Sequence, residues 1–168
     1  MVRLLVAGLL LTSGWAFAQW PSLDSPLPRQ GGGENDAALL ISIGDYVFLP
    51  DVAGAKENAR AWYQHLTVTR GVPGTQVVWL QDTEATLEGV RDALNRVVAK
   101  TRPGGTLWVL YIGHGAPTEN GDDGVLVGAD AQNVILSLYP RSLSRKELLK
   151  ALDAGKQARA VVLLDACF

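Results

Sequence analysis

The chain has 168 residues, 48% of them hydrophobic and 19% charged, which is enough apolar sequence for one domain with a buried core. Seventeen acidic residues against fifteen basic ones give a net charge of −2, and no basic block is present that could follow a phosphate backbone. The composition therefore argues against long disordered segments and against nucleic acid as a partner.

The first 18 residues have the pattern of a secretory signal peptide. Arg3 precedes an apolar stretch from Leu4 to about Leu11, and the small residues that follow end in Ala16-Phe17-Ala18, an A-x-A cleavage pattern. We expect cleavage after Ala18 and a secreted or periplasmic protein. The alternative is a membrane anchor, but the apolar run is shorter than the roughly 20 residues that span a bilayer. No stable membrane anchor is therefore expected after cleavage.

Residues 19–36 have the composition of a linker. They contain three prolines and three consecutive glycines, and they show no periodic apolar pattern. From Ala37 onward the sequence alternates between strand and helix patterns, so we expect residues 37–168 to form one domain.

This alternation predicts an α/β fold. Four short apolar runs have the length and β-branching of buried strands: 38–44, 77–80, 106–113 and 160–164. Three segments have helical periodicity: 55–66, 87–98 and 143–152. Thr86 is the expected N-cap of the second helix, and Ser144 and Glu147 have capping-box spacing in the third, which Gly155 would stop. A polar loop, 114–124, and a short strand within 125–130 are expected between them. Helices between apolar strands indicate a three-layer sandwich with a mainly parallel sheet.

Candidate catalytic and binding residues cluster where the predicted strands end. In such sheets ligands bind outside the carboxyl ends of the strands. There the first strand is followed by Asp45, the third by His114 and Gly115, and the fourth by Asp165 and Cys167, the only cysteine. If the last two strands are neighbours, about 4.8 Å apart, His114 and Cys167 share one crevice.

A thiol beside an imidazole can be activated as a nucleophile. The imidazole of His114 can take the thiol proton of Cys167, and the thiolate can then attack a carbonyl carbon. The backbone N–H groups of Gly115 and Cys167 are candidates to bind the resulting oxyanion. Taken alone, such a cysteine is most often a small buried hydrophobe, and such a histidine a hydrogen-bonded turn residue. Their coincidence at one sheet edge favours the catalytic interpretation.

The segments "LYIGHGA" and "VVLLDACF" resemble the large-subunit half of caspase-like cysteine peptidases, the group that holds caspases, metacaspases and bacterial caspase-family proteins. His114 precedes Cys167 by 53 residues, against roughly 50 in caspases. The segments "LLISIGDY" and "VAGAKENARAWYQHL" resemble the first strand and first helix of that family. The likeness covers about residues 37–168.

This resemblance implies a cysteine endopeptidase that hydrolyses peptides or proteins, with His114 and Cys167 as the catalytic dyad and Gly115 and Cys167 as the oxyanion site. Family members that cut after arginine or lysine have an acid two residues before the cysteine, and here that residue is Asp165. A basic P1 residue is therefore expected. Metacaspases carry a second acid of this S1 pocket in the first helix. Asn58 stands at that position here, and Asp45 is a candidate to compensate.

The acidic loop with Glu119, Asp122 and Asp123 is a candidate for calcium, as in some metacaspases, but it lacks the alternating ligand spacing of an EF-hand. A solvated loop is the alternative, and no other cofactor or metal is expected.

The family continues beyond the cysteine with two further strands. We therefore expect a sheet that is incomplete on its C-terminal side, with strand 160–164 at or near an exposed apolar edge, and a fragment or large subunit that awaits a small-subunit segment. Two other functions stay open: an inactive caspase-like scaffold that binds proteins, and a flavodoxin-like module that binds a small ligand. The flavodoxin-like alternative is weakened because the sequence lacks a glycine-rich phosphate loop that enters a helix.

Overall fold

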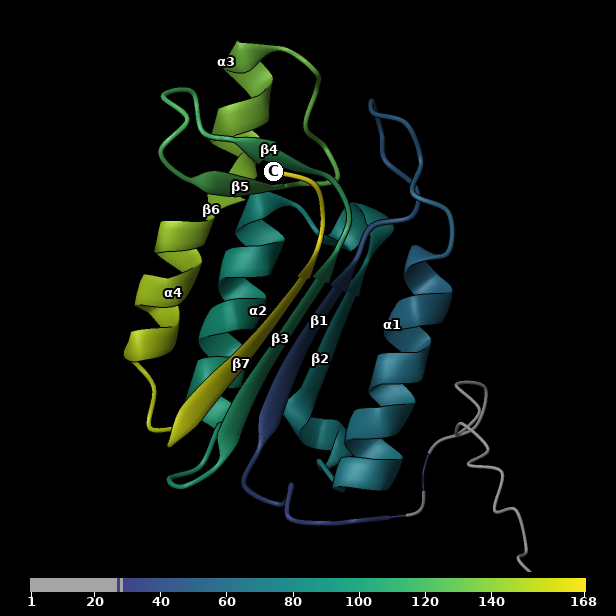
Figure 1. Ribbon diagram of the computed structural model, residues 1–168, viewed down its shortest axis with the longest axis vertical. Helices are drawn as coiled ribbons and strands as arrows, with labels where there is room; N and C mark the ends of the chain where they lie inside the picture. The colour runs from purple at the N-terminus through teal and green to yellow at the C-terminus, as the bar shows by residue number, and fades with distance from the viewer. Residues whose placement is uncertain (1–26, 28) are drawn as a thin grey trace, which may run out of the picture.

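The apolar runs of the sequence become the strands of one parallel sheet. In a computed structural model, which describes residues 27 and 29–168, four strands lie in the order β2-β1-β3-β7 (Figure 1). Their bounds are β1 Ala37–Ser42, β2 Val77–Gln81, β3 Thr106–Ile112 and β7 Arg159–Asp165. The expected α/β sandwich with a mainly parallel sheet is confirmed. The predicted signal peptide lies outside the described residues.

Helices cover both faces of this sheet. Helix α1 (Ala55–Gln64) lies on one face, and α2 (Leu87–Lys100) and α4 (Arg145–Asp153) lie on the other (Figure 1). Because side chains alternate along a strand, Leu110 packs beneath α1 while its neighbour Tyr111 packs on the α2 side. Strands buried on both faces need apolar residues at nearly every position, which is why the strand segments are continuous apolar runs.

Local capping explains where the helices α2 and α4 begin. Thr86 Oγ1 accepts a hydrogen bond from the Gly89 amide at 3.2 Å, and Ser144 Oγ accepts one from the Glu147 amide at 3.0 Å. Both predicted caps are confirmed. The second half of the predicted capping box is not formed, because the Glu147 carboxylate instead binds the Arg91 guanidinium of α2 with two hydrogen bonds, a stronger charge-assisted interaction.

The first helix is longer than its sequence pattern predicts. After α1 the chain continues as a π-helix, η1 (His65–Arg70), and ends at Gly71, which has a left-handed φ of 77°. Four shorter helical segments complete the helical content of the described residues: η2 Gly74–Gln76, η3 Asp82–Glu84, α3 Ile135–Leu138 and η4 Tyr139–Arg141.

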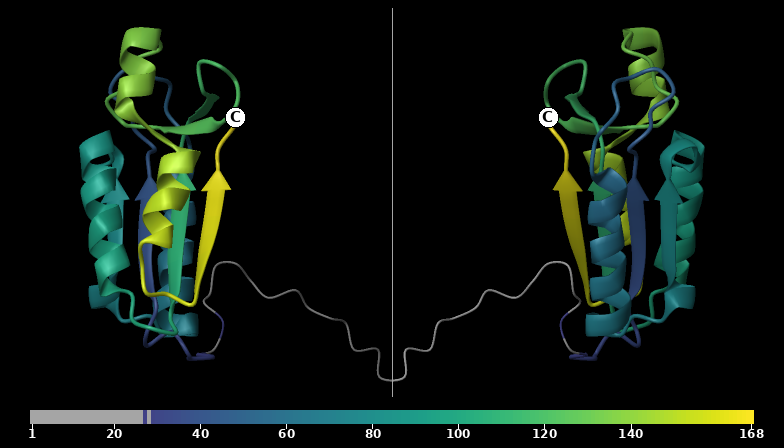
Figure 2. Two further views of the ribbon diagram at one scale, coloured as in Figure 1. Left: turned by 90° about the vertical axis from the view of Figure 1, so that its left-hand side faces the viewer. Right: turned by 90° about the vertical axis from the view of Figure 1, so that its right-hand side faces the viewer.

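A small antiparallel sheet lies beyond the carboxyl edge of the parallel one (Figure 2). It contains β4 (Gly115–Pro117), β5 (Gly124–Val127) and β6 (Ser142–Ser144) in that order. Strand β5 was expected. The expectation of a loop over all of 114–124 was wrong, because Gly115–Pro117 form β4 and Gly124 begins β5. Three-residue strands form because a neighbour offers hydrogen bonds, and their own sequence carries little pattern.

Strand β7 forms one edge of the parallel sheet. It pairs with β3 from Thr106 opposite Arg159 to Ile112 opposite Asp165, and no described strand pairs with its other side. Val161 and the three residues after it are only half-buried. The exposed apolar edge expected for strand 160–164 is therefore present.

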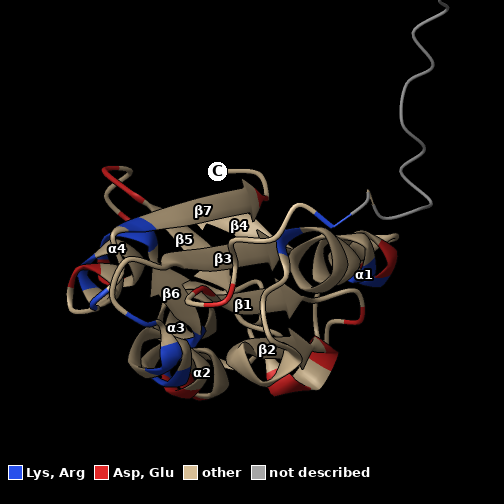
Figure 3. Cartoon of the chain, turned by 90° about the horizontal axis from the view of Figure 1, so that it is seen from below, with Lys and Arg blue, Asp and Glu red and all other residues tan. Residues whose placement is uncertain are grey.

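The last residues of the predicted linker lie against the domain. The Gln30 amide donates to the Thr69 carbonyl at 2.7 Å, and Asp36 is 1% exposed beside Arg70. Charged residues otherwise lie mainly on the helices and loops around the sheet (Figure 3). Among the described residues, no helix combines the length and apolar character needed to cross a membrane.

Candidate active site

The topological switch point of the parallel sheet lies between β1 and β3. The chain leaves β1 toward β2 on one side of the sheet and leaves β3 toward β7 on the other, so the two connections diverge. In open α/β sheets this point, outside the carboxyl ends of the strands, is where ligands bind. The loop after β1 and the residues after Ile112 begin at this switch point, and His114 is one of the latter.

A hydrogen bond to the loop after β1 holds the imidazole of His114. Its Nε2 lies 2.7 Å from the carbonyl oxygen of Pro50, in the loop between β1 and α1. Because a carbonyl oxygen only accepts, Nε2 carries the proton of this hydrogen bond. In the neutral imidazole Nδ1 is then the basic nitrogen. The imidazole also packs against the ring of Tyr46, with the two ring centres 4.7 Å apart.

Cys167 occupies the matching position on the neighbouring strand. Ile112 of β3 lies directly opposite Asp165 of β7, and the Gly113 amide extends the pairing with a 3.3 Å hydrogen bond to the Asp165 carbonyl. His114 and Cys167 therefore each follow the same pair of residues by two positions. The Cys167 side chain is exposed and not in a disulfide. The two predicted catalytic residues therefore follow neighbouring strands at the same edge of the sheet.

Gly115 lies in contact with the cysteine segment. A Cβ at this position would overlap the Cys167 carbonyl oxygen, so the approach of the two segments requires glycine. The Val127 amide donates to the His114 carbonyl at 3.0 Å, so these two residues form an opposed pair at a hydrogen-bonding position of the β4–β5 ladder, while the His114 N–H donates to Tyr46 Oη. Such pairs alternate, so Gly115, opposite Leu126, directs its N–H away from β5.

Two of the three predicted S1 residues are brought together. Asn58 Nδ2, from α1, donates to Asp165 Oδ2, at the end of β7, over 3.1 Å, and both residues are exposed. Asp45 does not join them by any hydrogen bond or ion pair among the described residues. Its backbone amide is held by Asp82 Oδ1 at 3.0 Å, as is the Gly44 amide at 2.9 Å.

Sequence patterns did not indicate several groups that surround His114. The Pro50 carbonyl is a backbone atom, so its role has no signature in side-chain type. Tyr46 and Tyr111 place their hydroxyls against the His114 backbone. Burial raises the pKa of Tyr46, and burial together with the neighbouring Tyr46 raises the pKa of Tyr111 well above its usual value, so both hydroxyls stay neutral. For Tyr46, its position just after a predicted strand was the one sequence feature that pointed to the site.

The acidic loop is engaged by basic residues. Asp122 Oδ2 pairs with Lys146 Nζ at 2.9 Å, an interaction that lowers the pKa of this carboxyl group. Asp123 accepts from Arg145 Nε at 3.0 Å and from the Lys146 amide at 2.9 Å, and it is buried. The expectation of a solvated loop was therefore wrong for Asp123. No cluster of three or more metal-ligating side chains occurs in the part of the chain that the structure describes.

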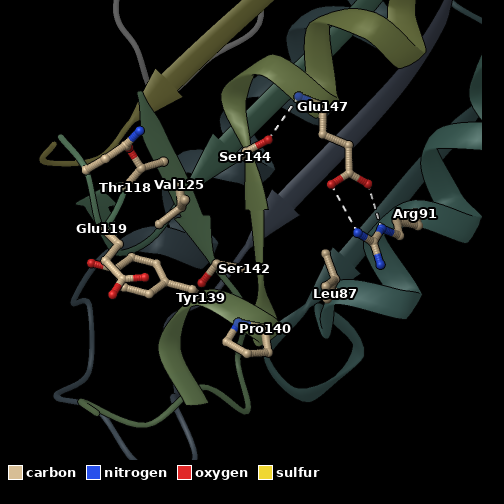
Figure 4. Close-up of a pocket in the computed structure, with 11 residues that line it drawn as sticks. Leu87, Arg91, Thr118, Glu119, Val125, Tyr139, Pro140, Ser142, Ser144 and Glu147 are labelled. Carbon is tan, nitrogen blue, oxygen red and sulfur yellow. Dashed lines mark hydrogen bonds and ion pairs between the residues drawn. The ribbon is translucent and has the colours of Figure 1, made fainter. Parts of the chain in front are cut away.

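A groove of about 700 Å³ lies elsewhere, between the small sheet and the helices α2 and α4 (Figure 4). Two of its three charged lining residues, Arg91 and Glu147, bind each other at 2.7 and 3.0 Å, and the third is Glu119. This pairing raises the pKa of the guanidinium and leaves less of either charge for a ligand. Neither His114 nor Cys167 lines the groove. These two predicted catalytic residues instead follow the carboxyl ends of β3 and β7.

Comparison with known proteins supports the fold alone. No protein-family model matches the sequence, and no curated protein does. Among solved structures, the crystal structure of protein GSU0716 from Geobacter sulfurreducens is similar, with a TM-score of 0.57 and 18% sequence identity. The similarity covers 79% of this chain and 50% of that chain, so this chain spans about half the length of the solved protein.

Proposed function

We propose that this chain carries the catalytic residues of a caspase-like cysteine endopeptidase that cleaves peptide bonds after a basic residue. The observation that carries the proposal is the pairing of β3 with β7, in which His114 and Cys167 each follow the Ile112–Asp165 pair by two positions. The exposed thiol and the hydrogen bond from the His114 imidazole to Pro50 support it further.

In this mechanism the imidazole Nδ1 takes the proton of the Cys167 thiol, and the sulfur attacks the carbonyl carbon of the scissile peptide bond. The N–H groups of Gly115 and Cys167 stabilise the oxyanion. When the C–N bond breaks, the His114 imidazolium returns its proton to the departing amine. Water then attacks the thioester, with the same imidazole as base, and releases the acid and the free thiol. The Pro50 carbonyl stabilises the imidazolium while it holds the second proton.

Asp165 is the proposed binding residue for the substrate side chain. Asn58 donates to only one carboxylate oxygen, Oδ2, which leaves Oδ1 for a guanidinium or ammonium group. A charge-assisted hydrogen bond at this point favours arginine or lysine at P1. Asp45, in the loop after β1, is a second candidate.

The open edge of β7 supports a second partner. Its half-buried apolar residues, and the backbone side that no described strand pairs with, are complementary to another strand. We propose a strand-forming segment of a small subunit as that partner. The signal-peptide pattern of residues 1–18 supports a secreted or periplasmic site of action.

The test compares cleavage of short peptides with Arg, Lys or Asp at P1. We expect the chain to prefer Arg and Lys, and we expect Cys167→Ala and His114→Ala to lower turnover at least about 1,000-fold. Lys150→Ala, on the exposed surface of α4, is the control and should leave turnover unchanged. Unchanged cleavage after Cys167→Ala would contradict the mechanism. No cleavage of any peptide by the wild-type chain would contradict the proposal and favour a binding scaffold.

A further inference from the structure

Two tyrosine hydroxyls bind the backbone of His114 from both sides. The His114 N–H donates to Tyr46 Oη at 2.7 Å, and Tyr111 Oη donates to the His114 carbonyl at 2.6 Å. Both distances are at the short end of the range for good hydrogen bonds. The peptide groups on either side of the imidazole are therefore held by side chains.

The two tyrosines come from different elements and contact each other. Tyr46 lies in the loop after β1 and is 8% exposed, and Tyr111 lies in β3 and is 2% exposed. Their hydroxyl oxygens are 3.3 Å apart, and both lie within hydrogen-bond distance of the Val127 carbonyl, at 3.4 and 2.9 Å. The loop after β1, the end of β3 and the start of the small sheet are thus joined through one polar cluster beneath His114.

Gly113 makes room for this cluster. A Cβ at this position would lie 2.5 Å from Tyr46 Oη and 2.9 Å from Tyr111 Oη. The glycine before the histidine is therefore required by the two hydroxyls, and the path of the backbone through Gly113 and His114 is shaped around them.

The same loop also holds the imidazole. Tyr46 binds the His114 backbone and packs on its ring, while Pro50, four residues later, accepts the hydrogen bond from Nε2. The Tyr46 amide donates to Asp51 Oδ1 at 3.3 Å, which closes the loop on itself. Main chain and side chain of His114 are therefore oriented by one short segment, and the direction of Nδ1 depends on both contacts.

We propose that Tyr46 and Tyr111 are positioning residues that direct Nδ1 of His114 toward the thiol of Cys167. The inference rests on the proposed function of this pair. Neither tyrosine touches substrate. Each acts through the backbone of His114, and the two hydroxyls work as a unit because they bind each other.

The test uses Tyr46→Phe and Tyr111→Phe, which keep the rings and remove only the hydroxyls. The rate at which iodoacetamide alkylates Cys167 is followed from pH 5 to 9, and kcat and KM are measured with the Arg peptide. We expect kcat to fall about 10- to 100-fold in each variant while KM changes less than about twofold. The pH–rate profile of alkylation should move toward that of His114→Ala. Tyr139→Phe, in η4, is the matched control and should behave as wild type.

A purely structural role predicts a different outcome. Both variants would then unfold at lower urea concentration, yet their folded forms would keep the wild-type alkylation profile, and this result would overturn the inference. All rates are therefore measured where circular dichroism shows a folded chain. A wild-type thiol that reacts no faster than free cysteine would contradict the proposed function itself. An activated wild-type thiol that stays equally reactive in both variants contradicts the positioning role alone.

Discussion

An aspartate lies at each end of the parallel sheet, and the two differ in burial and in the number of their hydrogen-bond partners. At the amino end, Asp36 is buried and accepts hydrogen bonds from Arg70 Nε at 2.9 Å, Trp108 Nε1 at 3.0 Å and the Thr106 amide at 2.7 Å. At the carboxyl end, Asp165 is exposed and accepts from Asn58.

This contrast separates structure from function within one sheet. A buried carboxylate whose oxygens are all bound by its own chain stabilises the fold and has nothing left for a ligand. An exposed carboxylate with a free oxygen contributes little to stability and can bind a charged group that arrives from solution. The amino end should therefore respond to substitution through stability, and the carboxyl end through activity.

The largest expected effect is on stability at the amino end. Asp36→Ala removes three hydrogen bonds and leaves the Arg70 guanidinium, 27% exposed, without its partner. We expect the free energy of unfolding, measured with urea, to fall by about 3–5 kcal/mol, as for other broken buried ion pairs. The same substitution at Asp165 should cost less than about 1 kcal/mol. Equal losses of unfolding free energy at Asp36 and Asp165 would contradict the distinction between a structural and a functional end of the sheet.

A smaller effect is expected on selectivity at the carboxyl end. Asp165→Asn keeps the size of the side chain and removes its charge, so the preference for Arg over an uncharged P1 residue should fall about tenfold in kcat/KM, or about 1.4 kcal/mol. Asp45→Asn provides the comparison for the second S1 candidate. A preference that survives Asp165→Asn and disappears in Asp45→Asn would assign the pocket to the β1 side.

The smallest effect concerns pH and the tyrosines beneath His114. Their pKa values are raised in the fold above the ordinary value of 10.0, so the folded state keeps protons that the unfolded state loses. This contribution is fully present below pH 10 and is lost as the pH rises above it. We expect urea stability to decline above pH 10, and to decline less steeply in Tyr111→Phe. An identical decline in the variant would show that other groups cause it.

Much of the fold was predictable because local and global preferences agree. Continuous apolar runs predicted all four parallel strands to within two residues at each end. The N-caps Thr86 and Ser144 predicted where two helices begin. The π-helix after Gln64 was not predicted, since its residues show no distinct periodicity. The short strands β4 and β6 were missed because their pairing depends on β5 and not on their own sequence.

The candidate site was predictable only in part, for a related reason. Strand ends predicted that His114, Gly115, Asp165 and Cys167 lie at the carboxyl edge of the sheet, as they do, and Asn58, a candidate from the resemblance to metacaspases, hydrogen-bonds to Asp165. The Pro50 carbonyl was missed because any residue can supply a carbonyl oxygen. The tyrosine hydroxyls were missed because they bind the His114 backbone, and the position of Tyr46, 68 residues before His114, carries no sign of that contact.

The central claim is that residues 114 and 167 lie at one rim, and a disulfide tests it most directly. A disulfide requires Cα atoms about 4.4–6.8 Å apart. We predict that His114→Cys, mildly oxidised, forms an intramolecular bond with Cys167, seen as a loss of two mass units and of both free thiols in the monomer. Ala99→Cys, near the amino end of the sheet, is the control and should keep both thiols. Two free thiols in oxidised His114→Cys would contradict the account.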